Sequence, residues 1–266
     1  MQNLLAFSTL GCPAWDLDRI ISSAVEYGYD AVELRGYQKE MDLTKADPYT
    51  LENRAETLVR FSDAGITVCC VSSSGVVAQR NVDHVRDHAR LARDLECPHV
   101  RVFGGDLDAN LSRSEALAKA AASLRAFGDA AEAEGVKIVL ETHDAFSTGQ
   151  GVAELIALAA HPAVQSLWDL HHPFRQNEPF EETLRYLAPT LAHVHIKDGK
   201  AGVYTLLGEG DVPLFPMLDL LLDSGYSGPI SLEWEKRWHP EIQDPEIAFP
   251  QYAQALRSYL KERSAP

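Results

Sequence analysis

Short segments rich in β-branched residues alternate with longer amphipathic segments along almost the whole chain. Such alternation is typical of parallel strands that are each followed by a covering helix. The cycle repeats about eight times, and eight strand–helix units are the number in a TIM barrel. We therefore predict an α/β fold, a (β/α)₈ TIM barrel.

Helix start and stop signals place the boundaries of these units. Gly28 is expected to end the first helix, and Asp47-Pro48 has the pattern of an N-cap followed by proline in the first turn. Ser112 and Glu115 have the spacing of a capping box. The expected strands are 4–10, 30–35, 66–71, 99–103, 136–141, 164–169, 191–196 and 230–234. The expected helices are 15–27, 47–58, 82–95, 112–135, 152–160, 181–187, 214–223 and 247–260.

A doubly wound open sheet is the structural alternative, because sequence does not reveal strand order. No G-x-G-x-x-G follows the first strand, however, which disfavours a dinucleotide-binding sheet of that kind. The chain has 266 residues, and α/β barrels commonly reach about 250 residues as one domain. We therefore expect residues 1–266 to form a single domain.

The charge balance excludes several classes of partner. The formal net charge is −15 and the isoelectric point is near 5.0, and no run of Lys and Arg interrupts this acidity, so nucleic acid is not expected as a partner. Charged residues interrupt every apolar stretch before it reaches membrane-spanning length, and the first ten residues lack the pattern of a signal peptide. The four cysteines show no C-x-x-C pairing and are expected to be buried thiols. We expect a cytoplasmic protein that acts on a small molecule; a homo-oligomer is left open.

Each of the last four expected strands ends in a residue that can bind a metal. These residues are Glu141, Asp169, His195 and Glu233. A single such residue is commonly a solvated strand end or an ion-pair partner, but strand ends on the C-terminal face of a barrel form its active site. Three carboxylates and an imidazole would repel one another or bind a cation. We predict one divalent ion per chain, Mn²⁺, Zn²⁺, Co²⁺ or Mg²⁺, since no second His/carboxylate cluster is visible in the sequence. Glu235 shares strand parity with Glu233 and is the alternative ligand.

Other polar residues near the strand ends are candidates for the substrate pocket. Lys197 shares a face with His195 and is expected either to hold a substrate oxygen or to pair with Asp198 or Glu235. Arg101 and His143 are predicted to point inward and to line the pocket or pack the barrel mouth. Trp238, in the loop after strand eight, is a candidate for stacking on a sugar ring or for simple packing.

Five short stretches carry a resemblance to a known family. They are GYDAVELR at 28–35, LETHD at 140–144, WDLHH at 168–172, HVHIKD at 193–198 and LEWEKRWHP at 232–240. Together they resemble the xylose isomerase-like barrel superfamily, in particular its sugar phosphate isomerase/epimerase branch with inosose isomerases, inosose dehydratases and ketose 3-epimerases. The resemblance covers nearly the whole chain and implies enzymes of carbohydrate metabolism.

Carried over by position, the resemblance implies that Glu141, Asp169, His195 and Glu233 bind the metal. It also implies that Glu141 and Glu233 exchange protons with the substrate, and that His172, in the spacing Asp169-x-x-His172, lies near a substrate oxygen. Ketose epimerases carry a basic residue shortly after the strand-seven histidine. Here that stretch reads Lys197-Asp198-Gly199-Lys200, without arginine, so the resemblance does not identify the substrate.

This site predicts an isomerase or epimerase of a sugar, keto-sugar or inosose that works by proton transfer through a metal-bound enediolate. Dehydration of a keto-polyol, assisted by His172 or Lys197, is the alternative within enzymes. A non-catalytic metal- or sugar-binding barrel is the alternative of another class, since a fold does not establish turnover. A DNA-repair endonuclease is disfavoured because it would need further metal-binding histidines and a basic groove.

Overall fold

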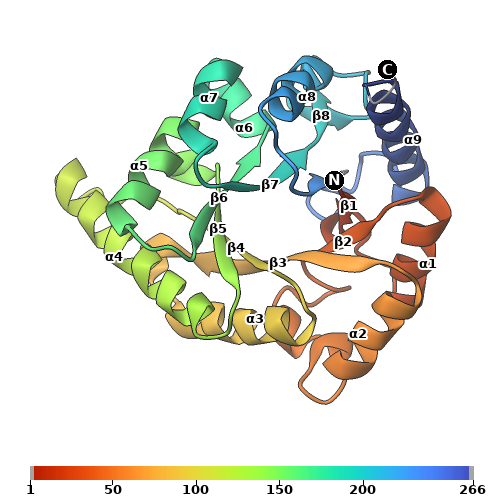
Figure 1. Ribbon diagram of the computed structural model, residues 1–266, viewed down its shortest axis with the longest axis horizontal. Helices are drawn as coiled ribbons and strands as arrows, with labels where there is room; N and C mark the ends of the chain where they lie inside the picture. Colours follow the sequence, from red (N-terminus) through yellow and green to blue (C-terminus); the bar gives the residue numbers. More distant parts are fainter. Residues whose placement is uncertain (1–2, 264–266) are drawn as a thin grey trace.

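The computed structural model describes residues 3–263, in which eight parallel strands close into a barrel (Figure 1). Neighbouring strands follow chain order, and β1 closes the ring by pairing with both β2 and the last barrel strand, β10. The prediction of a (β/α)₈ TIM barrel is thereby confirmed. The barrel strands are β1 (Leu5–Ser8), β2 (Ala31–Leu34), β3 (Thr67–Val76), β4 (His99–Phe103), β5 (Lys137–Glu141), β6 (Val164–Asp169), β7 (Leu191–Ile196) and β10 (Ile230–Leu232).

The helices form a ring outside the strands (Figure 1). They are α1 (Leu17–Tyr27), α2 (Arg54–Asp63), α3 (Val82–Asp94), α4 (Arg113–Glu132), α5 (Gly149–Ala159), α6 (His171–Arg175), α7 (Phe180–Leu187), α8 (Leu214–Asp223) and α9 (Pro245–Arg263). The short α6 and an antiparallel hairpin of β8 (Asp198–Lys200) with β9 (Val203–Thr205) were not predicted; they follow β6 and β7 at the C-terminal end of the barrel.

Local signals explain three of the helix ends. The Asp16 side chain caps α1 by accepting the backbone N–H of Arg19, and Gly28 ends the helix in the left-handed conformation, at φ +79°. The capping box of Ser112 and Glu115 is present at the start of α4. The Gly28 stop and the capping box confirm two of the predicted signals, and the Asp16 cap was not predicted.

Several predicted boundaries were wrong; the third strand, for example, continues to Val76, and two others have a clear local cause. The first strand is shorter than 4–10, because a 3₁₀ turn at Thr9–Gly11 begins directly after Ser8. Asp47 does not cap a helix: Asp47–Tyr49 is a separate 3₁₀ turn, and α2 begins only at Arg54. The turn places the ring of Tyr49 in the core, fully buried and edge-on to Tyr37. Burial of this aromatic ring outweighs the local preference for a continuous helix.

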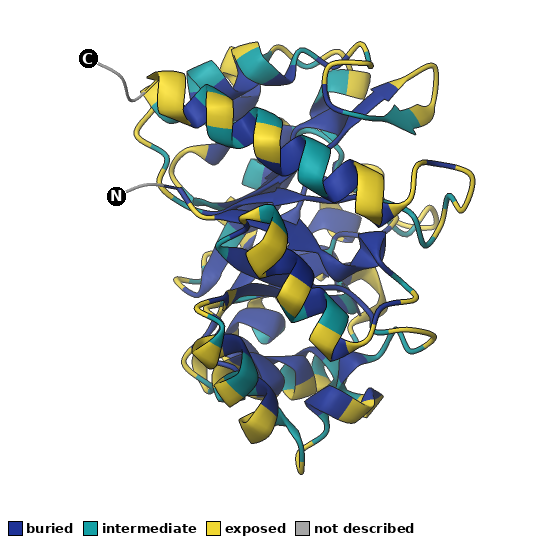
Figure 2. Cartoon of the chain, turned by 90° about the vertical axis from the view of Figure 1, so that its right-hand side faces the viewer, coloured by how far each residue is buried: buried dark blue, intermediate teal, exposed yellow. Residues whose placement is uncertain are grey.

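The main core lies between the strands and the helices, and the exposed faces of the helices point away from the barrel (Figure 2). A smaller cluster joins buried residues of β1, β2, β3, β5 and β6, which meet inside the barrel. All four cysteines are free and buried, as expected. None of the described helices is long and apolar enough to cross a membrane.

Candidate metal centre

Four of the predicted residues meet at the C-terminal end of the barrel. Glu141 and Asp169 are the last residues of β5 and β6, His195 is the next-to-last residue of β7, and Glu233 directly follows β10. One ligand atom from each residue lies within 4.8 Å of the others, and all four residues are buried. Parallel strands in register bring their carboxyl ends to one face, which is why residues far apart in sequence converge here. We call this group the carboxylate cage.

The free atoms of the cage fit a divalent cation. His195 Nδ1 lies 3.4 Å from Glu141 Oε1 and 3.5 Å from Glu233 Oε2. Both carboxylate oxygens of Glu141 and Nδ1 of His195 are buried without a hydrogen-bond partner among residues 3–263. Buried polar atoms are costly when unpaired, and three carboxylates with one imidazole form a donor set that Mn²⁺, Zn²⁺ or Co²⁺ accepts.

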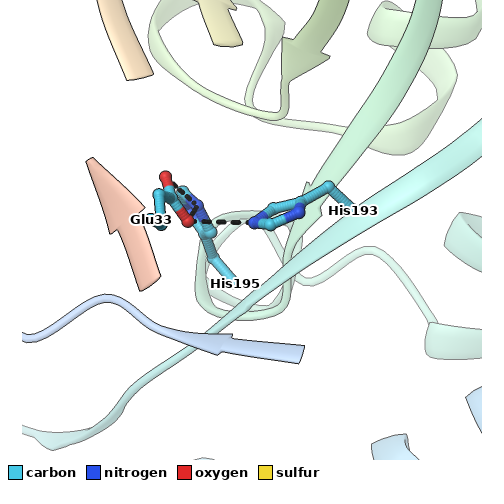
Figure 3. A group of neighbouring side chains, drawn as sticks. All are labelled: Glu33, His193 and His195. Atoms are coloured by element: carbon cyan, nitrogen blue, oxygen red, sulfur yellow. Dashed lines mark hydrogen bonds and ion pairs between the residues drawn. The ribbon is translucent and has the colours of Figure 1, made fainter. Parts of the chain in front are cut away.

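The far side of the His195 ring is held by a residue that the sequence analysis missed. Both carboxylate oxygens of Glu33, on β2, lie 2.9 Å from His195 Nε2, and one of them also lies 2.9 Å from His193 Nε2 (Figure 3). With Nε2–H donated to Glu33, His195 presents the lone pair of Nδ1 to the cage. Such an outer carboxylate is the usual partner of a metal-binding histidine, because it fixes the tautomer and the orientation of the ring.

The pKa shifts of Glu33 and His195 show how strongly these two side chains interact. Burial opposes the ionisation of Glu33, but the charges and N–H groups of His195 and His193 outweigh it and hold the pKa of Glu33 well below its usual range. Burial also disfavours protonated His195, yet Glu33 and Glu233 raise the pKa of His195 well above its ordinary value. The cluster therefore stabilises a positive charge at its centre, which a proton or a metal ion would supply.

Lys197 lies beside the cage and is fully buried. Its Nζ is 2.7 Å from Asp169 Oδ2 and 2.7 Å from Glu235 Oε1, and it also donates to Glu233 Oε2. Burial opposes the charge, but the three carboxylates raise the pKa of Lys197 well above its ordinary value, so it is an ammonium group. Glu235 is thus bound to Lys197 and lies outside the group of cage ligands, whereas Glu233 belongs to it.

The predicted pairing of Lys197 with Asp198 is not observed. Asp198 accepts backbone N–H groups of Gly199, Gly208, Gly210 and Val212 instead. These bonds hold the β8–β9 hairpin and the loop after it. Of the two predicted ion-pair partners, only Glu235 contacts Lys197.

The remaining pocket candidates form a rim around the cage, with one exception. His172 Nε2 lies 3.6 Å from Asp169 Oδ2, and the His172 ring lies 4.7 Å from that of His143. Arg101 Nε lies 3.4 Å from Glu141 Oε2. Trp238 differs: its side chain is 52% exposed, and the group seen over its ring is the guanidinium of Arg237.

Arg35 is, after Glu33, the second residue near the site that the sequence analysis missed. Its side chain is basic. It is buried and donates to the hydroxyl of Ser74, and burial together with the charge of Arg101 lowers its pKa to about 9. Glu233 and Glu141 act on it in the opposite direction, so Arg35 contributes positive charge near the cage.

Comparisons with known proteins agree with this architecture. The model of the family described as xylose isomerase-like TIM barrel matches residues 21–262. The chain is 28% identical to an inosose dehydratase of Clostridium perfringens over 185 residues, which cover 61% of this chain and 59% of that relative. The chain therefore spans only about three fifths of the length of this relative. It is 20% identical to a fructoselysine 3-epimerase of Escherichia coli over 270 residues, which cover 96% of this chain and 97% of the relative.

Solved structures share the fold at lower sequence identity. A structure of L-ribulose 3-epimerase superimposes with a TM-score of 0.80 at 18% identity, covering 98% of this chain and 95% of the other. The structure of a probable 3-DHS dehydratase, AsbF of Bacillus anthracis, gives a TM-score of 0.79 at 17% identity, with 97% and 99% covered. Epimerases and a dehydratase thus occur on the same barrel.

Proposed function

Because the chain belongs to the xylose isomerase-like TIM barrel family, we propose that it is a divalent-metal-dependent isomerase or epimerase of a sugar, keto-sugar or inosose. One observation carries the proposal: Glu141 and Glu233 approach the same nitrogen of His195, at 3.4 and 3.5 Å, from strands on either side of it. Two carboxylates that face one small space are what proton removal and proton return at neighbouring positions require. The substrate class is supported by the similar proteins, which include a fructoselysine 3-epimerase and an L-ribulose 3-epimerase.

Glu141, Asp169, His195 and Glu233 would hold the ion. When bound, a divalent ion acts as a Lewis acid on a substrate carbonyl and acidifies the neighbouring C–H group. Burial opposes ionisation of both glutamates, but neighbouring cations and His195 lower the pKa of each, so both are carboxylates. Glu141 would remove the proton from one face, and Glu233, after taking up a proton from solvent, would return one on the other.

The carbon that receives the proton decides the outcome. Return to the same carbon on the opposite face gives an epimer, and return to the neighbouring carbon gives an aldose–ketose isomer. Glu33 would keep the His195 ring in place through either reaction, and Arg101 would orient Glu141 through their 3.4 Å contact.

Dehydration of a keto-polyol is the second candidate, and Lys197 is the observation that favours it. Its buried ammonium group lies beside Asp169 and Glu233, where it can hydrogen-bond a leaving hydroxyl and stabilise the charge that develops on it. His172, at the rim, offers a second acid. The inosose dehydratases among the relatives fit this candidate by name.

Turnover in D₂O with added Mn²⁺ or Co²⁺ tests the proposal and separates the two reactions. We would incubate a panel of keto-sugars and inososes and follow them by NMR. An epimer or isomer with deuterium next to the carbonyl supports proton transfer by the glutamates. Loss of water with a new unsaturated carbonyl supports the dehydratase. Binding of metal and sugar without any product would contradict both and favour a non-catalytic barrel.

A further inference from the structure

A second group of potential metal ligands lies outside the carboxylate cage. It consists of Asp42, in the segment after β2, and of His84 and His88 on the first two turns of α3. One ligand atom of each lies within 4.8 Å of the others. The i,i+4 spacing of the histidines brings both rings to one face of the helix, with ring centroids 4.2 Å apart. None of the three residues belongs to the cage.

The Nε2 atoms of both imidazole rings in this group are free to bind a metal ion. Nδ1 of His88 lies 2.8 Å from the carbonyl oxygen of His84, so Nδ1–H is the donor and Nε2 carries the lone pair. His88 is fully buried, and its Nε2 faces Asp42 Oδ1 at 3.7 Å, too far for a hydrogen bond. Nε2 of His84 and Nε2 of His88 are both buried without a hydrogen-bond partner in the part of the chain that the structure describes. Burial lowers the pKa of His88 to about 4, so this ring is neutral at pH 7.

We propose that Asp42, His84 and His88 form a second divalent-metal site that is independent of the cage. Two imidazole nitrogens and one carboxylate oxygen select Zn²⁺, Co²⁺ or Ni²⁺ over Mg²⁺ and Ca²⁺, which prefer oxygen ligands. Three protein ligands leave a fourth position for water.

The surroundings of Asp42 support a bound ion in two ways. Its Oδ1 accepts the backbone N–H of Thr44, at 3.2 Å, and the hydroxyl of the same residue, at 2.6 Å, which fixes the carboxylate. Its Oδ2 pairs with Lys45 at 3.0 Å, but the Lys45 side chain is 71% exposed, so an ion would displace it at little cost.

Positive charge nearby limits the affinity of this second site. Arg35 acts electrostatically on both His84 and His88, and both histidines lie near the positive N-terminal end of α3. The cage offers three carboxylate ligands, whereas the second site offers only one. We therefore expect the second site to bind more weakly than the cage, and to join the segment after β2 to α3 when it is filled.

The proposed site adds a second ion to the one divalent ion per chain that the sequence analysis predicts. The i,i+4 histidine pair is visible in the sequence, but Asp42 lies 42 residues before His84, and nothing in the sequence shows that it faces that pair. The cage still accounts for one ion, and the second site adds another.

Metal titration of the stripped protein tests the proposal. With Zn²⁺ or Co²⁺ followed by calorimetry and elemental analysis, the wild-type chain should bind two equivalents. His84→Ala and Asp42→Asn should each weaken the weaker equivalent at least about tenfold and leave the tighter one unchanged. Asp42→Asn keeps an oxygen for the bonds from Thr44, and His84 is only partly buried, so both variants should fold.

His161→Ala is the matched control, because His161 also lies beside carboxylates, Asp129 and Glu132, but outside the three candidate ligand groups found among residues 3–263. It should retain two equivalents. A cage variant, His195→Ala, should lose the tighter equivalent and keep the weaker one, which separates this proposal from that of the cage. A single equivalent in the wild type that is retained in His84→Ala, or two undisturbed equivalents in His84→Ala, would overturn the second site.

Discussion

Replacement of Glu33 by glutamine should weaken metal binding at the cage without removing any ligand. The Glu33 carboxylate accepts three donors: Nε2–H of His195, Nε2–H of His193 and the hydroxyl of Ser72. Glutamine offers one accepting oxygen, and its NH₂ group would face an N–H group. His195 then loses its acceptor or changes tautomer, and the second outcome puts a proton on Nδ1, the nitrogen that faces the cage.

Loss of such an outer partner typically costs 10- to 100-fold in metal affinity. This corresponds to about 1.4 to 2.7 kcal/mol. Competition with a chromophoric chelator, using Mn²⁺ or Co²⁺ and the stripped protein, would measure the change. Ser72→Ala is the control, because it removes one donor to Glu33 and leaves both imidazole bonds, so its affinity should stay within about twofold of wild type. A thermal unfolding curve of each variant would confirm that it folds. Equal metal affinity in Glu33→Gln and wild type would refute the role given to Glu33.

Three further predictions concern the cage itself. His195→Ala and Asp169→Asn should lower metal affinity more than they lower thermal stability, because both groups lie at the barrel end; unchanged affinity in both variants would rule out the cage. Glu141→Gln and Glu233→Gln should each reduce kcat by at least about 100-fold on the true substrate, since an amide does not accept the carbon-bound proton; a fully active variant would remove that glutamate from the reaction. Neighbouring carboxylates raise the pKa of His195 despite burial, so the metal-free imidazole carries a proton that the ion must displace. Metal affinity should therefore rise as the pH rises toward the raised pKa of His195, with proton release measurable by calorimetry in two buffers, and a flat profile would contradict this account.

The cage could be predicted from sequence because each of its members stands at the end of a strand. The two-residue period of a strand and the common direction of barrel strands suffice to bring Glu141, Asp169 and His195 to one place. Glu33 could not be paired in the same way: its partners lie 160 and 162 residues away on β7, and two strands separate β2 from β7 in the barrel. The available signal was a charged residue inside the buried strand Ala-Val-Glu-Leu, since a buried charge requires a partner.

The partner of Lys197 was open in the sequence for a different reason. Asp198 is its neighbour in the chain, and Glu235 is 38 residues away, so proximity in sequence favoured the wrong residue. The β8–β9 hairpin, with strands of three residues each, is too short to leave a clear pattern, yet its backbone N–H groups and those of the following loop occupy the Asp198 carboxylate. The Lys197 ammonium group therefore pairs with Asp169 and Glu233 of the cage instead. Short irregular elements of this kind decide where such side chains point.

The two glutamates of the cage are not equivalent, and this bears on the direction of proton transfer. Burial raises the pKa of each, but Glu233 contacts the ammonium group of Lys197 as well as His195, and its pKa lies well below the usual range. Glu141 lies beside His195 and, at 3.4 Å, Arg101; burial and the charge of Glu233 act to raise its pKa, but Arg101 and His195 lower it. Neither oxygen of Glu141 accepts a hydrogen bond among residues 3–263, and a carboxylate that is not hydrogen-bonded to an ammonium group is the freer base. Glu141 is therefore the better candidate to remove the substrate proton, and Glu233, which accepts a hydrogen bond from the Lys197 ammonium group, is the better candidate for the face on which the proton returns or a hydroxyl leaves.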